Sequence, residues 1–161
     1  MTNFPALLSK LVHSKVRFIV IGGAAAIAHG SPRLTLDLDV VYQRDPGNIG
    51  LLVEALRDCE PYLRGAPPGL PFNWDAETIR RGLNFTLTTT LGNLDVLGEI
   101  AGGGAYEDLL PHTISVQLYG VECSCLNLPH LIRVKRAAGR PQDLLAVAEL
   151  EAILEEREDR A

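Results

Sequence analysis

The chain has 161 residues, of which 47% are hydrophobic, and its formal net charge is −5. This length favours a single domain over residues 1–161 with a core of its own, and the net acidity disfavours a surface that coats nucleic acid. No apolar run reaches the roughly 20 residues that cross a bilayer, no leader sequence is recognised, and three cysteines do not make a disulfide framework, so we expect a cytoplasmic protein without a membrane partner.

Glycines, prolines and N-cap residues separate the predicted elements of the N-terminal half. In chain order these are a helix over 4–12, a strand over 16–21, a helix over 24–30, a strand over 35–42 and a helix over 46–59.

The C-terminal half begins with a proline-rich loop over 60–74, and a loop of this length is more often functional than neutral. The predicted elements that follow are a helix over 75–82, strands over 83–90 and 94–100 with a hairpin turn at Gly92-Asn93, a glycine segment with a helical turn over 101–112, strands over 113–119 and 121–126 around Gly120-Val121, and helices over 128–139 and 141–158. This mixed order predicts an α+β fold in which one mixed β-sheet is flanked by helices.

The predicted strand over 35–42 carries two aspartates on one face. Asp37 and Asp39 alternate with Leu36, Leu38 and Val40, which we expect to anchor the opposite face in the core. The two carboxylates then lie about 6.5–7 Å apart along the strand. Either this face lies in water or a positive group sits on it, because unpaired carboxylates that face a core are costly.

The segment around Asp95 has the same alternation, with Leu94 and Val96 on the other face. If the two strands are neighbours, Asp95 completes a cluster of three carboxylates. Three such charges raise one another's pKa unless cations neutralise them, and their hard oxygens suit Mg²⁺. For a lone D-x-D pattern, alternation on a half-exposed strand is the favoured explanation, so this pattern alone does not establish a metal site.

Gly22 and Gly23 favour a phosphate site beside the aspartates. Adjacent glycines at the end of a strand let backbone N–H groups approach an anion, and the start of the next helix adds a favourable potential. The dinucleotide-binding fingerprint is excluded because no third glycine follows at the required spacing, and no G-x-x-x-x-G-K-[ST] phosphate loop occurs.

These residues resemble the signature of the polymerase-β-type nucleotidyltransferase superfamily. The signature consists of Gly22-Gly23, then Asp37-Leu38-Asp39-Val40 after thirteen intervening residues, and Leu94-Asp95-Val96 on a later strand. The likeness is to small single-domain bacterial and archaeal members, including toxin-like ones, whose C-terminal helices the segment "LIRVKRAAGRPQDLLAVAEL" also resembles. The resemblance extends from about Phe4 to Leu154 and implies a nucleotidyltransferase-like sheet.

The resemblance also implies roles for the motif residues. Gly22 and Gly23 would hold the triphosphate of a nucleotide such as ATP through backbone contacts. Asp37 and Asp39 would bridge two Mg²⁺ ions, with Mn²⁺ as the alternative metal. Asp95 would ligate the catalytic ion and help to activate the acceptor hydroxyl in an in-line displacement at the α-phosphate.

Further residues have weaker assignments. Lys135 would reach the β- or γ-phosphate as a point charge, and Asp143 would orient Lys135 or the helix turn. Ser31 and Arg33, in the loop before the aspartates, are candidates for contact with phosphate or acceptor, although a solvated turn explains them as well. His29, at a helix end, is more typical of a cap or a packed surface residue than of a catalytic base.

Two other patterns favour packing over function. Cys123, Cys125 and His130 suggest zinc, but no fourth ligand stands at metal-site spacing, and alternation directs both cysteines to one face, expected to be the core. Trp74 and Phe72 are more easily explained by covering the core than by stacking a base.

The leading hypothesis is a Mg²⁺-dependent enzyme that transfers a nucleoside monophosphate from a nucleoside triphosphate to an acceptor hydroxyl on a protein, an RNA or a small molecule. By analogy with toxin-like members, an antitoxin would be a partner. The alternative is a catalytically inactive nucleotide- or partner-binding module with the same fold. A third hypothesis is hydrolysis on the same acidic cluster, with water as the acceptor.

Overall fold

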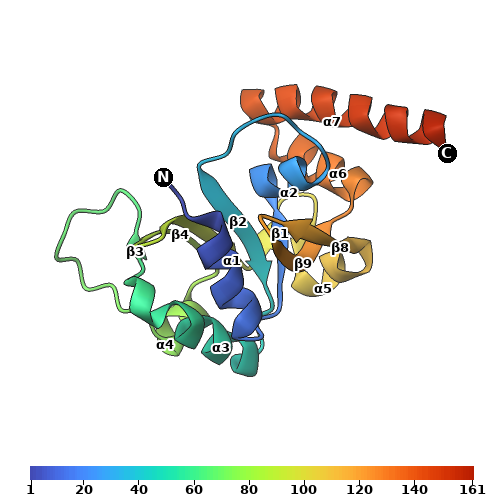
Figure 1. Cartoon of the computed structure of the whole chain (residues 1–161). Helices are drawn as coiled ribbons and strands as arrows, with labels where there is room; N and C mark the ends of the chain where they lie inside the picture. Colours follow the sequence, from blue (N-terminus) through green and yellow to red (C-terminus); the bar gives the residue numbers. More distant parts are fainter.

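The computed structural model describes residues 1–161 as a seven-stranded mixed sheet surrounded by helices (Figure 1). The strands are β1 (Phe18–Ile21), β2 (Asp37–Tyr42), β3 (Tyr62–Leu63), β4 (Asn84–Thr89), β5 (Gly92–Leu97), β8 (Thr113–Leu118) and β9 (Val121–Leu126), and a separate two-stranded sheet joins β6 (Glu99–Ile100) to β7 (Gly104–Ala105). The α-helices are α1 (Phe4–His13), α2 (Gly22–Ala28), α3 (Pro46–Leu56), α4 (Ala76–Arg81), α5 (Tyr106–Leu109), α6 (Leu128–Ala138) and α7 (Pro141–Arg160), with short 3-10 turns η1 (Arg57–Cys59) and η2 (Leu110–His112).

The order of the strands places β2 at the centre of the large sheet. The order is β3-β4-β5-β2-β1-β9-β8, in which β2 runs parallel to β5 and antiparallel to β1. β1 is parallel to β9, the pairs β4–β5 and β8–β9 are antiparallel hairpins, and the edge strand β3 is antiparallel to β4. The α+β class and the mixed sheet predicted from the sequence are therefore confirmed.

One cluster of 39 buried residues forms the hydrophobic core. The helical spacing of the apolar residues in α1 directs its buried face to the sheet, and α6 buries a similar stripe. Figure 1 shows α7 running along one side of the molecule, with its C-terminal part extending past the other elements. No helix combines the length and apolar character needed to cross a membrane.

Local geometry shifts several predicted boundaries. Helix α2 begins at Gly22 itself, directly after β1, so the two glycines open the helix rather than form a loop. The predicted hairpin turn at Gly92-Asn93 is wrong: β5 begins at Gly92, and the turn consists of residues 90–91. Gly92 is needed at φ +114° because a Cβ there would lie 2.5 Å from the Cα of Thr2.

The loop over 60–74 contains β3, and its remaining part projects outward beside β3 (Figure 1). Trp74, near its end, packs on the core and donates its indole N–H to the Val53 carbonyl oxygen at 3.1 Å, as expected for a core-covering residue. The expectation that Leu36 anchors the core is wrong. β2 begins one residue later, and the Leu36 side chain is 71% exposed.

Candidate active site

Three aspartates lie on the two parallel strands at the centre of the sheet. The register of β2 and β5 places Asp39 opposite Asp95 and Asp37 opposite Asn93. Because opposite residues in a parallel pair share a face, all three carboxylates project from the same side of the sheet. Leu38, between the two aspartates of β2, is fully buried on the other side. The structure thus brings together the three aspartates singled out in the sequence.

The carboxyl group of Asp39 is strongly affected by its surroundings. Burial, and then the adjacent charges of Asp95 and Asp37, raise the pKa of Asp39 to about 7, against an opposing effect of Lys135. Its Oδ1 atom is buried and has no hydrogen-bond partner. A buried carboxylate oxygen without a partner is costly, and a proton or a cation at this oxygen relieves that cost.

Gly22 allows the backbone to come against Asp39. The register of β1 and β2 places Ile21 opposite Asp39, and Gly22 follows at φ +66°. A Cβ at Gly22 would lie 2.3 Å from Asp39 Oδ2, and one at Gly23 would lie 2.6 Å from Thr35 Oγ1. Ile21, the N-cap of α2, has no side chain that could bind the first amide groups of the helix, which leaves them open to another acceptor.

A cavity of about 490 Å³ opens beside these groups. Its volume falls within the range of roughly 300–1,000 Å³ that is usual for small-molecule sites. The functional residues predicted from the sequence that line it are Gly22, Gly23, Ser31, Arg33, Asp37, Asp39, Asp95, Lys135 and Asp143. One concave surface therefore collects all the candidate site residues.

Lys135, on α6, is the free cation of this cavity. Its ammonium group makes no hydrogen bond or ion pair within the chain. Burial lowers the pKa of Lys135, and the nearby charges of Asp143 and Asp39 oppose this shift. A half-buried ammonium group without a partner is suited to an anionic ligand.

The other candidate residues from the loop before β2 and from α7 have partners within the chain. Arg33 Nε lies 2.8 Å from Glu149 Oε2 of α7, and Ser31 Oγ accepts a bond from the Arg33 backbone N–H at 3.3 Å. Asp143 accepts bonds from Arg140, whose Nε lies 2.6 Å from Asp143 Oδ2. Asp143 thus pairs directly with Arg140, while its interaction with Lys135 is through charge alone.

Two residues that contact the carboxylates were not identified from the sequence. Asn93 donates its amide N–H to Asp37 Oδ1 at 2.9 Å, and Arg64 lies 2.7 Å from Asp95 Oδ1 and 3.6 Å from Asp37 Oδ2. Alternation could have identified Asn93, which stands two residues before Asp95. Arg64 has no such signal, because the pairing of β3 with β4 brings it to the site.

The donor set of this face fits Mg²⁺. No group of three acidic, histidine or cysteine side chains is already arranged to hold a metal ion, and Arg64 neutralises two of the carboxylates instead. Asp39 Oδ1 nevertheless remains without a partner, and the carboxylates of Asp37 and Asp95 supply further hard oxygens. These three residues would hold the ion.

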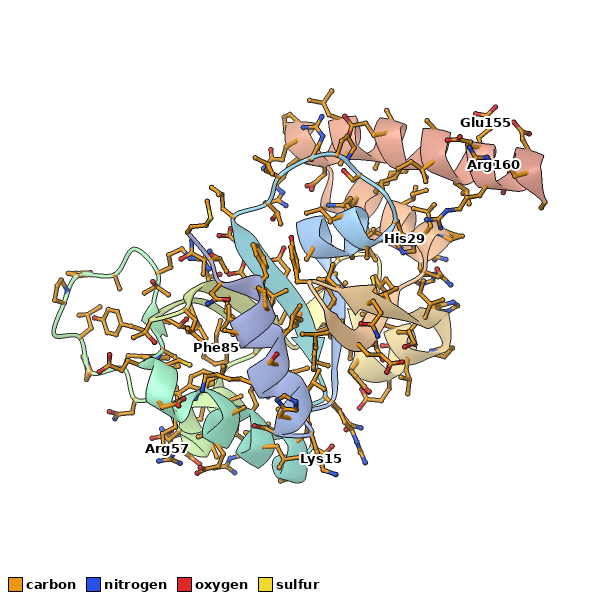
Figure 2. All side chains as sticks on the ribbon, in the orientation of Figure 1. Lys15, His29, Arg57, Phe85, Glu155 and Arg160 are labelled. Atoms are coloured by element: carbon orange, nitrogen blue, oxygen red, sulfur yellow. The ribbon has the colours of Figure 1, made fainter.

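His29, Cys123 and Cys125 are structural. His29 is a buried residue at the C-cap of α2 rather than a surface residue (Figure 2). Its Nε2 lies 2.7 Å from the Leu126 carbonyl oxygen, and its Nδ1 lies 3.2 Å from a guanidinium nitrogen of Arg157. Since the guanidinium can only donate, this arrangement requires a neutral imidazole with the proton on Nε2. Both cysteines are buried in the core, as alternation predicts.

The fold is similar to those of several solved structures. The chain is similar to the lincosamide antibiotic adenylyltransferase LnuA in a lincomycin-bound structure, with a TM-score of 0.61 and 14% identity over 93% of this chain and 95% of that one. The chain has a nucleotidyltransferase fold. A proposed nucleotidyltransferase from Thermotoga maritima, TM1012, gives a TM-score of 0.54 at 14% identity over 99% of this chain and 96% of that one.

A third similar structure is an antigenic nucleotidyltransferase-like protein from Paracoccidioides brasiliensis. Its TM-score is 0.55 at 16% identity, over 91% of this chain and 71% of that one. No family model and no curated protein matches the sequence.

Proposed function

We propose that the protein is a Mg²⁺-dependent nucleotidyltransferase that transfers a nucleoside monophosphate from a nucleoside triphosphate, such as ATP, to an acceptor hydroxyl. The observation that carries this proposal is the pairing of Asp39 with Asp95 across β2 and β5, with Gly22 against Asp39. The free ammonium group of Lys135 lines the same cavity.

The proposed role of each residue follows from its position in the cavity. Asp37, Asp39 and Asp95 would hold one or two Mg²⁺ ions, or Mn²⁺ as the alternative, and a bound ion would supply positive charge to the reacting phosphate. The first amide groups of α2, at Gly22 and Gly23, receive the triphosphate. Ser31 and Arg33 line the cavity wall that the nucleotide or the acceptor contacts.

The reaction is a single displacement. The acceptor oxygen forms a bond to the α-phosphorus, and the bond from this phosphorus to the bridging oxygen of the β-phosphate breaks. Asp95 takes the hydroxyl proton, and pyrophosphate leaves with the electron pair. Lys135 stabilises the charge that develops on the departing pyrophosphate.

Two classes of acceptor are compatible with this proposal. A protein or RNA acceptor would agree with the toxin-like members that the sequence resembles, with an antitoxin as partner and the cytoplasm as the place of action. A small hydroxyl compound would agree with LnuA, whose structure contains lincomycin.

Labelling experiments test the activity directly. The protein is incubated with Mg²⁺ and each α-labelled nucleoside triphosphate, together with lincosamides, total RNA or purified proteins, while pyrophosphate release is followed. We expect label in one acceptor class with the wild type and with Asp159→Asn, an exposed control near the end of α7, and none with Asp95→Asn. Release of free labelled monophosphate alone would indicate water as the acceptor and favour hydrolysis.

A catalytically inactive binding module is the second candidate. The observation that favours it is Arg64, which already neutralises Asp37 and Asp95. Nucleotide binding that is unchanged by Asp37→Asn and occurs without Mg²⁺ would support this module and exclude the transferase.

A further inference from the structure

Arg64 reaches the carboxylates from the edge of the sheet. It directly follows β3, and its side chain passes β4, where Nη2 donates to the Leu87 carbonyl oxygen at 2.7 Å. The same Nη2 donates to Asp95 Oδ1 at 2.7 Å, and Nη1 lies 3.6 Å from Asp37 Oδ2. One guanidinium group thus contacts two of the three carboxylates proposed to bind metal.

Two cations lie beside the carboxylates without a metal ion. Asp37 and Asp95 face Arg64, and Lys135 lines the same cavity as Asp39. A divalent cation would therefore enter a site in which two of the three carboxylates already have a positive partner.

We propose that Arg64 is a built-in cation that competes with the divalent metal for Asp95 and Asp37, so that metal binding displaces its guanidinium group. The proposal rests on the proposed function, because it is there that these aspartates bind metal. Arg64 is accordingly a positioning residue: it holds the carboxylates in place before metal arrives and leaves them afterwards.

The surroundings of Arg64 favour such an exchange. Its Nε is buried without a hydrogen-bond partner, so the site does not satisfy all of its donors. Its side chain is 25% exposed and it directly follows β3, so part of the side chain is already in contact with solvent.

Arg64 lies on the opposite side of the carboxylates from Gly22 and Lys135, the residues proposed to bind the triphosphate. Gly22 and Lys135 reach Asp39 from the side of β1 and α6, whereas Arg64 arrives from β3 at the opposite edge. Displacement of Arg64 therefore leaves the triphosphate contacts intact. It opens the carboxylates on the side that remains for the acceptor.

Metal titration of charge variants tests the competition. Mn²⁺ binding is followed by electron paramagnetic resonance, with Mg²⁺ as competitor and with and without a non-hydrolysable ATP analogue, in wild type, Arg64→Met and Arg64→Lys. Arg44→Met is the matched control, since Arg44 also donates to backbone carbonyls but contacts none of the three aspartates. Chemical unfolding in EDTA accompanies each titration.

We expect Arg64→Met to bind Mn²⁺ about tenfold more tightly than the wild type or more, because a competing unit charge is removed at contact distance. Arg64→Lys should lie between the two, and Arg44→Met should bind as the wild type does. In EDTA, Arg64→Met should be destabilised, and saturating Mn²⁺ should restore more stability to it than to the wild type.

Unchanged or weaker Mn²⁺ binding in a folded Arg64→Met would overturn the competition. If the wild type still binds ATP analogue and metal through Asp37, that result leaves the proposed function standing. Absence of metal binding in every variant would overturn the competition and, together with metal-independent nucleotide binding, the proposed function as well.

Discussion

Replacing Asp39 with asparagine should stabilise the metal-free protein, and increasingly so at higher pH. In the folded state the pKa of Asp39 is raised to about 7, from 3.8 in an unperturbed aspartate. Between these values the native state binds a proton that the unfolded chain has lost, so the contribution of Asp39 to the free energy of unfolding falls as pH rises. Above pH 7 the loss is complete.

The magnitude follows from the pKa difference. Each unit corresponds to about 1.4 kcal/mol, so an ionised Asp39 costs the native state about 4 kcal/mol at pH 8 and less than about 1 kcal/mol at pH 4. An asparagine of the same shape avoids this cost and can donate its amide N–H to Asp95. Since the three carboxylates respond to one another, we expect a measured gain of about 2–4 kcal/mol at pH 8.

Urea unfolding in EDTA at pH 4, 6 and 8 measures this gain for Asp39→Asn against the wild type. Asp159→Asn serves as the control and should show no pH-dependent difference. Adding Mg²⁺ should then stabilise the wild type but not Asp39→Asn. A gain that is the same at all three pH values would refute the reasoning, because the gain would then not come from the ionisation of Asp39. A loss of stability at pH 8 would also refute it, because it would mean that Asp39 has a stabilising structural partner.

Three further substitutions test other parts of the site. Lys135→Ala should weaken the binding of a triphosphate about tenfold or more while a monophosphate binds almost as before, because the proposed contact of the ammonium group is with the β- or γ-phosphate, which a monophosphate lacks. Equal losses in calorimetry would contradict this role. Gly22→Ala should cost about 1–3 kcal/mol in urea unfolding and abolish nucleotide binding, because its Cβ would meet Asp39 Oδ2. Gly65→Ala is its control, with a similar positive φ and open space around it, and equal losses in the two variants would contradict a steric cause. His29→Gln should remove a loss of stability that the wild type shows as pH falls below about 6.5, because burial lowers the pKa of His29 and only the unfolded chain gains the proton; unfolding curves that differ by a constant amount from pH 5 to 8 would contradict this.

The sequence predicted the centre of the sheet more reliably than its connections. Alternation around Asp37, Asp39 and Asp95 gives each side chain its face, since the period of a strand is fixed by backbone geometry. The sequence predicted a three-carboxylate cluster only if β2 and β5 are neighbours. It could not predict that they are, because strand pairing depends on contacts that are distant in sequence. The structure shows that β2 and β5 are parallel neighbours, with Asp39 opposite Asp95.

The errors have local physical causes. Gly92 looked like a turn residue, but it is required by the close approach of Thr2, which no local pattern reveals. Leu36 follows the alternation of its neighbours, yet the strand begins after it and leaves it exposed.

The electrostatics of the site could not be obtained from sequence. The partners of the carboxylates come from other strands, because Asn93 precedes Asp95 on β5 and Arg64 follows β3 at the sheet edge. The raised pKa of Asp39 likewise depends on burial and on neighbours that only the folded chain assembles.

The most direct test of the transferase proposal is a calorimetric titration of a non-hydrolysable nucleoside triphosphate, with and without Mg²⁺, into the wild type and Asp37→Asn. It requires no knowledge of the acceptor. We expect binding to the wild type that needs Mg²⁺ and is lost in a fully folded Asp37→Asn. Absence of binding to every nucleotide, or binding indifferent to both the metal and Asp37, would contradict the assignment of this cavity as a nucleotidyltransferase site.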